Sequence, residues 1–147
     1  MSIDRRAFLL STIPIPFYAA NPLAVLSADE ARIVEALCDQ IVPADDAAGA
    51  KQAGVLYYID RQLAGPLKRF APRYHSGLPA FRDLPNLGFA EQTAFLSALK
   101  GDAASFFQLV VDHTMQGFYG SPEHGGNRDE ASWKMLGIED MMGGHSH

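Results

Sequence analysis

The sequence predicts an all-α fold, a small helical domain of about four main helices that ends in a long loop rich in glycine and aromatic residues. Apolar residues recur at helical spacing in four segments, and no segment of useful length alternates apolar and polar residues as a half-buried strand does. The chain has 147 residues, 48% of them hydrophobic and 20% charged, which is typical of one globular domain. Its net charge of -5 disfavours a nucleic-acid partner, because phosphate neutralisation requires a basic face.

Residues 1–26 are expected to form a signal-like segment that precedes the helical domain at 27–147. The paired Arg5 and Arg6, followed by Phe8, Leu9 and a mildly hydrophobic stretch, resemble the twin-arginine export signal. The apolar stretch is too short to span a membrane. A buried N-terminal segment is the alternative interpretation.

The sequence leaves open whether this segment is removed. Ala19-Ala20 lacks a small residue two positions upstream of Ala20, so it is a poor signal-peptidase site. Val25-Leu26-Ser27 is a tolerable cleavage sequence and no more.

The first helix is predicted to begin at Ser27, which forms a capping box with Glu30. Pro43 is expected to end this helix, and the acidic, small residues at 43–49 predict a loop. One face of the helix is apolar, and it consists of Val34, Leu37, Cys38 and Ile41.

A second helix is predicted over about 51–63, with Arg61 on its polar side and Gly65-Pro66 at its end. Four prolines between positions 65 and 88 argue against a long helix there, so this stretch is predicted to be irregular with at most one short helical turn. The prolines are Pro66, Pro72, Pro79 and Pro85.

Two further helices are predicted, over about 89–99 and 103–116, with Gly101 as the cap of the former. The latter has a wide apolar face and leads into residues 117–137. Because residues 117–137 contain five glycines, Gly117 and Gly137 included, but no sustained apolar periodicity, they are predicted to form a loop.

This predicted loop carries the residue types that anchor protein interfaces, since aromatic rings bury a large area at low entropic cost and arginine pairs bidentately. We therefore expect it to contact a partner protein. Alternatively, Trp133 and Phe118 cap the helical core, and Arg128 and Asp129 pair locally. The predicted interface residues are Phe118, Tyr119, Asn127, Arg128, Asp129 and Trp133.

The ligand sets of common redox cofactors are missing from the sequence. No G-x-G-x-x-G follows a strand, and no E-x-x-H pair is present for a di-metal site. Cys38 is the single cysteine, so neither covalent haem nor an iron–sulfur cluster has its ligands. The chain is therefore predicted to hold no catalytic, cofactor-binding or metal-ligating residue of its own.

Two alternatives stay open from the residues alone. One is a free-standing exported metalloenzyme that uses His113 or His124, and the other is an exported scaffold or binding module unrelated to redox chemistry. Cys38 is either a small core residue or the site of an intersubunit disulfide, which an unpaired cysteine in an oxidising compartment raises.

Several stretches, distributed over nearly the whole chain, form a distinctive set. The most specific are Gly117-Phe118-Tyr119-Gly120, Gly125-Gly126-Asn127-Arg128-Asp129 and Trp133-Lys134-Met135-Leu136-Gly137, and Gln40-Ile41-Val42-Pro43-Ala44-Asp45 adds to them. With the twin-arginine start, this set resembles the gluconate 2-dehydrogenase subunit 3 family.

The resemblance implies a small, non-catalytic subunit of a periplasmic, membrane-associated dehydrogenase. In such a complex a large subunit carries FAD and oxidises a sugar, sugar acid or polyol, and a cytochrome subunit with haem c accepts the electrons. The small subunit helps the large one to mature and to be exported by the twin-arginine route.

Overall fold

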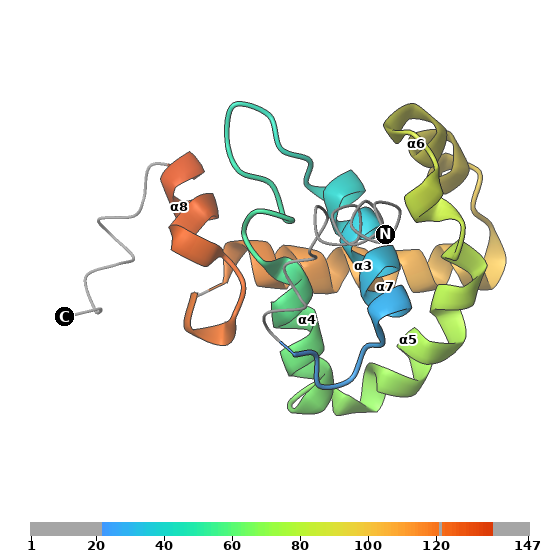
Figure 1. The fold of residues 1–147 in the computed structure, drawn as a ribbon, viewed down its shortest axis with the longest axis horizontal. Helices are drawn as coiled ribbons and strands as arrows, with labels where there is room; N and C mark the ends of the chain where they lie inside the picture. The colour runs from blue at the N-terminus through green and yellow to red at the C-terminus, as the bar shows by residue number, and fades with distance from the viewer. Residues whose placement is uncertain (1–21, 121, 137–147) are drawn as a thin grey trace, which may run out of the picture.

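A computed structural model describes residues 22–120 and 122–136 of the chain, and every regular element in these residues is helical (Figure 1). The all-α prediction is confirmed for this part of the chain. The described residues form six α-helices, where about four were predicted. They are α3 (Ala28–Ile41), α4 (Val55–Ala64), α5 (Ala71–Gly77), α6 (Phe89–Ser97), α7 (Gly101–Tyr119) and α8 (Ala131–Leu136).

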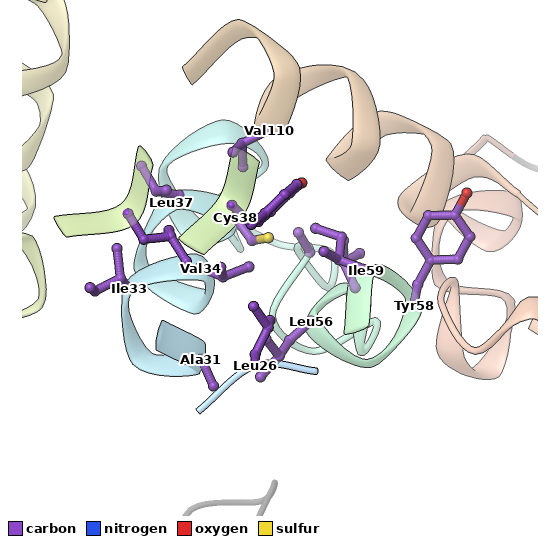
Figure 2. Close-up of a cluster of buried hydrophobic side chains, with 14 of the residues drawn as sticks. Leu26, Ala31, Ile33, Val34, Leu37, Cys38, Leu56, Tyr58, Ile59 and Val110 are labelled. Carbon is purple, nitrogen blue, oxygen red and sulfur yellow. The ribbon is translucent and has the colours of Figure 1, made fainter. Parts of the chain in front are cut away.

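Helix α7 runs along the molecule, with α8 at one end and α6 at the other, while α3 and α4 cross it (Figure 1). The core lies where α3, α4 and α7 meet. Figure 2 shows Val34, Leu37 and Cys38 of α3 gathered with Ile59 of α4 and Val110 of α7. Burial of such side chains is the main stabilising contribution in a domain of this size.

The capping box predicted for the first helix is present. The Ser27 hydroxyl accepts from the Glu30 N–H at 3.1 Å, and the Glu30 carboxylate accepts from the Ser27 N–H at 3.0 Å. Burial alone would raise the pKa of Glu30, but these hydrogen bonds and the nearby His75 lower it below its usual value. The N-terminal end of α3 is therefore fixed by its own sequence.

Helix α4 begins at Val55, about four residues later than predicted. Its N-cap is Gly54, which has a left-handed backbone with φ of 73°. Residues 51–54 form a turn instead of a first helical turn. The apolar stripe predicted the helix correctly, but a left-handed glycine marks its start.

The proline-rich stretch is more helical than predicted, and that prediction is wrong. A chain of short elements fills it: the 3₁₀-helix Lys68–Phe70, α5, and the 3₁₀-helices Leu78–Phe81 and Leu84–Asn86. Proline lies in the first turn of the last three of these elements, where a missing N–H costs nothing. Pro72, Pro79 and Pro85 therefore start helical turns and do not prevent them.

The stretch 117–137, predicted to be a loop, is largely helical in its described residues. Helix α7 continues to Tyr119, and α8 occupies Ala131–Leu136, with the 3₁₀-helices Pro122–His124 and Arg128–Glu130 between them. Residues 1–21, Ser121 and residues 137–147 lie outside the described part of the chain, so the export pattern does too.

Among the described helices, none is by itself long and apolar enough to cross a membrane. Taken together, helices α6 and α7 have the length and the apolar composition of a membrane span, but they are bent by 119° at the break between them.

Candidate functional site

The C-terminal segment, residues 117–136, packs back onto α4 through two buried glycines. Gly117 lies in the last turn of α7 against the ring of Tyr58, where an added Cβ would stand 2.5 Å from Tyr58 Cδ1. Gly126 lies against the backbone carbonyl oxygen of Gly117, and a Cβ there would overlap that oxygen. Glycine is required at both positions for this close approach of the backbone.

Asn127 links the end of α7 to the start of α8. Its side chain is fully buried, and its Nδ2–H donates to the carbonyl of Gly120 at 2.8 Å. Its Oδ1 accepts from both the backbone N–H and the hydroxyl of Ser132, each at 2.8 Å. The two bonds to Ser132 are buried, so their loss leaves polar groups unsatisfied at a cost of about 1–3 kcal/mol each.

The backbone around Asn127 is strained. Asn127, Asp129 and Glu130 have positive φ angles of 47°, 58° and 57°, a region that Asn and Asp visit more readily than other residues with a Cβ and that glutamate rarely occupies. Such outliers persist only where the surrounding contacts determine the conformation, and they cluster at binding and catalytic sites. The hydrogen bonds of Asn127 supply those contacts here.

Arg128 connects the C-terminal segment to the start of α4. Its backbone N–H donates to the carbonyl of Ala53 at 2.7 Å, and its guanidinium carbon lies 5.5 Å from the centre of the Tyr57 ring. A Cβ on Gly54 would stand 2.9 Å from the Arg128 side chain. Gly54 therefore serves two purposes, since it adopts a left-handed backbone and leaves room for the guanidinium.

The three aromatic residues of the predicted interface differ in exposure. Phe118 is fully buried and Trp133 is 6% exposed, whereas Tyr119 is 42% exposed. The Phe118 and Tyr119 rings meet edge to face at 4.9 Å, and the Trp133 indole N–H donates to the Tyr119 carbonyl at 3.2 Å. Phe118 and Trp133 thus complete the core of this chain, and Tyr119 is the aromatic side chain that faces outward.

A cavity of about 550 Å³ lies between α4 and the C-terminal segment. Its charged lining residues are two arginines, Arg61 and Arg128, and two aspartates, Asp60 and Asp129. Arg61 packs on Gly125, whose φ of 99° also favours glycine. The remaining lining residues come from three parts of the chain, and they include Pro22, Ala24, Tyr57, Ala64, Pro122 and Gly126.

Cys38 is a core residue. It is 1% exposed, and its Sγ lies 3.5 Å from the Thr114 hydroxyl. Burial raises the pKa of its thiol to about 12, an effect that the Thr114 hydrogen bond only partly offsets. A thiol so placed and so weakly acidic does not reach another subunit without local unfolding, which disfavours the intersubunit disulfide.

His113 is buried as well, at 4% exposed, and its Nδ1 lies 2.8 Å from the Tyr74 hydroxyl. Burial lowers the pKa of His113, while Asp112 raises it and Arg69 lowers it further. The ring stacks on Tyr74 at 5.8 Å between centroids. Its environment is that of a core histidine bonded to a tyrosine.

All six predicted interface residues lie in the C-terminal segment, but only some of them are exposed at the surface. Asp129 is exposed, Arg128 is half-buried, and Asn127 is buried. Within residues 22–120 and 122–136, no three His, Cys, Asp or Glu side chains lie together as a metal site requires. The side chain of His124 is outside the described ones, and so are the export residues Arg5, Arg6, Phe8 and Leu9.

Sequence reasoning missed three contacts that shape this region. They are the packing of Arg128 over Gly54, the fit of Gly117 against Tyr58, and the role of Asp60, whose carboxylate binds the backbone of residues 24–26. An aspartate on the buried stripe of a predicted helix was the available signal, since an ionised carboxylate is rarely buried without partners.

One of the comparisons with known proteins identifies a family. The model of the family described as gluconate 2-dehydrogenase subunit 3 matches residues 28–139, from the start of α3 to beyond α8. No curated protein and no solved structure matches the sequence. Because the family model covers most of the chain, including the whole C-terminal segment, the chain belongs to the gluconate 2-dehydrogenase subunit 3 family.

Proposed function

We propose that this chain is the non-catalytic small subunit of a heteromeric FAD-dependent dehydrogenase that acts on sugars, sugar acids or polyols. The observation that carries the proposal is the family match over residues 28–139, because the family's name designates one subunit of a dehydrogenase assembled from several. The FAD belongs to the large partner subunit, and a membrane-bound cytochrome subunit with haem c is a further partner.

The inner side chains of the domain support a structural role. Two pairs of polar side chains in its core are hydrogen-bonded within the pair, Cys38–Thr114 and Tyr74–His113. Hydrogen bonding of this kind is usual for polar side chains buried in a core. Cys38, the single cysteine, supplies no C-x-x-C-H attachment for haem.

The C-terminal segment is the surface that we assign to the large subunit. It combines a backbone held in a strained shape with an exposed aromatic ring at Tyr119 and a cavity flanked by Arg61 and Arg128. Interfaces are enriched in aromatic and arginine anchors, and a pre-formed surface binds at a lower entropic cost. The small subunit then stabilises the large one while it folds and takes up FAD.

We further propose that the complex is exported to the periplasm by the twin-arginine route, with the signal supplied by residues 1–26 of this chain. Twin-arginine export carries folded proteins, so a large subunit without its own signal is transported with this one. Membrane association comes through the partner subunits.

The test is expression of the large subunit with and without this chain. We expect a similar catalytic rate per bound flavin in both preparations, but a much lower flavin occupancy and yield of exported enzyme without the small subunit. A large subunit that acquires full flavin and reaches the periplasm alone would refute the proposal. Metal analysis and turnover assays of the isolated small subunit separate it from a free-standing metalloenzyme.

A further inference from the structure

Asp60 binds the chain just before α3. It lies on α4, is 5% exposed, and its carboxylate accepts three consecutive backbone N–H groups. The Ala24 N–H donates to Oδ2 at 2.6 Å, and the N–H groups of Val25 and Leu26 both donate to Oδ1 at 2.9 Å. We name this arrangement the Asp60 clamp.

Two further contacts hold the same stretch. The Leu26 side chain is 4% exposed and belongs to the hydrophobic core. Ser27 follows as the N-cap of α3, with both hydrogen bonds of the capping box formed. Residues 24–27 are therefore fixed by a buried carboxylate, by the core and by a helix cap.

This geometry affects proteolytic processing. A protease binds its substrate as an extended chain whose backbone N–H groups and side chains are free to enter its cleft, so cleavage depends on the burial and hydrogen bonding of the backbone. Val25-Leu26-Ser27 is the tolerable signal-peptidase sequence of this chain. Its backbone is occupied by the Asp60 clamp and its middle side chain is in the core.

We infer that the Asp60 clamp closes the bond between Ser27 and Ala28 to signal peptidase, and that the exported subunit keeps residues 24–27. Any hydrolysis during export then adds one water molecule across a peptide bond on the N-terminal side of Ala24. The inference rests on the proposed export, because a chain exported in its folded state meets the peptidase with the clamp already formed. Asp60 is thus a positioning residue that protects the start of the domain.

The residues held by the clamp also lie near the C-terminal segment. Pro22 and Ala24 line the same cavity as Gly125, Gly126 and Arg128. Cleavage after Ser27 would remove that wall of the cavity, next to the surface that we assign to the large subunit. Protection of residues 24–27 therefore keeps Ala24 in this wall of the cavity in the exported protein.

The first test uses the purified full chain and needs no export. Detergent-solubilised signal peptidase is added to the folded wild type, to Asp60→Ala and to the control Asp83→Asn, which changes an exposed aspartate with no side-chain hydrogen bond at its helix cap. Intact mass should show no cut after Ser27 in the wild type and control, and at least a tenfold higher yield of that cut in Asp60→Ala. The urea-unfolded wild type should be cut there as well.

Cleavage of the folded wild type after Ser27, or resistance of the unfolded chain at that bond, would overturn the inference. Since Asp60→Ala could unfold more than the clamp, Asp60→Asn is included, which keeps one acceptor oxygen. Amide exchange should be slowed at least tenfold for Ala24, Val25 and Leu26 in the wild type, less in Asp60→Asn and least in Asp60→Ala. Exchange at these amides as fast as in the unfolded chain would also overturn it.

The second test is the N-terminal sequence of the exported wild type. A first residue at or before Ala24 is expected, and a chain that begins at any residue from Val25 to Ala28 would contradict the clamp. A chain that stays in the cytoplasm would instead contradict the proposed export, and the peptidase assay then decides the inference by itself.

Discussion

The indole N–H of Trp133 donates to the backbone carbonyl of Tyr119 at 3.2 Å, so α8 is bonded to the end of α7. The two residues have opposite environments, because Trp133 is 6% exposed and Tyr119 is 42% exposed. Aromatic content predicted one shared role for both residues, as interface anchors. The structure assigns Trp133 to the subunit's own core and leaves the Tyr119 ring on the surface.

Packing of the C-terminal segment on α4 depends on the absence of side chains at two glycines. We expect Gly117→Ala and Gly126→Ala each to lower the free energy of unfolding by about 1–3 kcal/mol, the usual cost of overpacking. The loss at Gly117 is diagnostic, since Gly→Ala inside a helix otherwise stabilises by up to about 1 kcal/mol. Urea unfolding of the purified variants measures it.

The control for these variants is Gly88→Ala, where an added Cβ would stand 3.5 Å from the flexible side chain of Glu91. Gly88 is a helix N-cap, so alanine costs at most about 1 kcal/mol there. Equal stability of the wild type and Gly126→Ala would show that the segment does not pack on α4 as described.

Helix-start and helix-stop residues predicted the helix ends that depend on neighbouring residues in the sequence. The capping box at Ser27 and Glu30, and the stop at Pro43, placed α3 correctly at both ends. The prolines misled because their effect depends on position, and a proline in the first turn of a helix is favourable. The sequence does not show which position in a turn a proline will occupy.

The sequence indicated that the C-terminal segment contacts other residues or a partner, but it did not predict the helices of this segment or its packing on α4. Its glycines suggested a loop, yet Gly117 lies within α7, and the Tyr58 ring, 59 positions earlier, packs against its bare backbone. The Asp60 clamp likewise joins residues 34 to 36 positions apart. Contacts between residues so far apart leave no periodic trace in a single sequence.

His113 predicts a pH dependence of stability. Burial lowers its pKa in the folded chain, while the unfolded chain keeps a value near 6.5. The unfolded state therefore binds more protons between those two values, and stability falls as the pH drops from about 6.5 through the folded pKa. We expect the midpoint of urea unfolding to decrease between pH 7.5 and 5.5 in the wild type.

His113→Gln should be less stable than the wild type at pH 7.5, because it alters the contact with Tyr74, but its unfolding midpoint should change less between pH 7.5 and 5.5. Glu30 does not interfere in this interval, since its lowered pKa affects stability only below about 4.5. Identical pH slopes in the two proteins would contradict the assignment to His113.

Cys38 should be inert in the folded subunit. Its burial and its pKa of about 12 leave almost no thiolate at neutral pH, so we expect no reaction with a thiol reagent until the chain unfolds. The assembled complex should show no disulfide to this chain on a non-reducing gel. Rapid labelling of the native protein, or a crosslink that is lost in Cys38→Ser, would support the intersubunit disulfide instead.

Export should depend on the arginine pair. We predict that replacing Arg5 and Arg6 with lysine holds this chain in the cytoplasm, together with any partner that lacks its own signal, because the twin-arginine pathway recognises the pair and not merely its charge. Fractionation and immunoblotting measure the distribution. Arg82→Lys, at an exposed position within the domain, is the matched control. Unchanged periplasmic levels of the double variant would exclude this route.

The contrast between Tyr119 and Trp133 tests the proposed docking surface. Trp133→Ala should lower the stability of the isolated subunit by about 3–5 kcal/mol, since it removes a buried aromatic side chain. Tyr119→Ala should cost the isolated subunit less than Trp133→Ala, because Tyr119 is 42% exposed; its edge-to-face contact with Phe118 adds about 0.5–1.5 kcal/mol to the effect of the area that it buries. If Tyr119 is an interface anchor, the same change should weaken binding to the large subunit by about 2 kcal/mol or more.

Phe89→Ala supplies the control for this measurement, because Phe89 is 52% exposed and belongs to α6, at the opposite end of the molecule from α8 (Figure 1). Binding of each folded variant to the immobilised large subunit gives the comparison. Loss of binding in Tyr119→Ala but not in Phe89→Ala would locate the partner at the end of α7. The reverse result would move the interface to α6, and equal, full binding by both variants would remove Tyr119 from it.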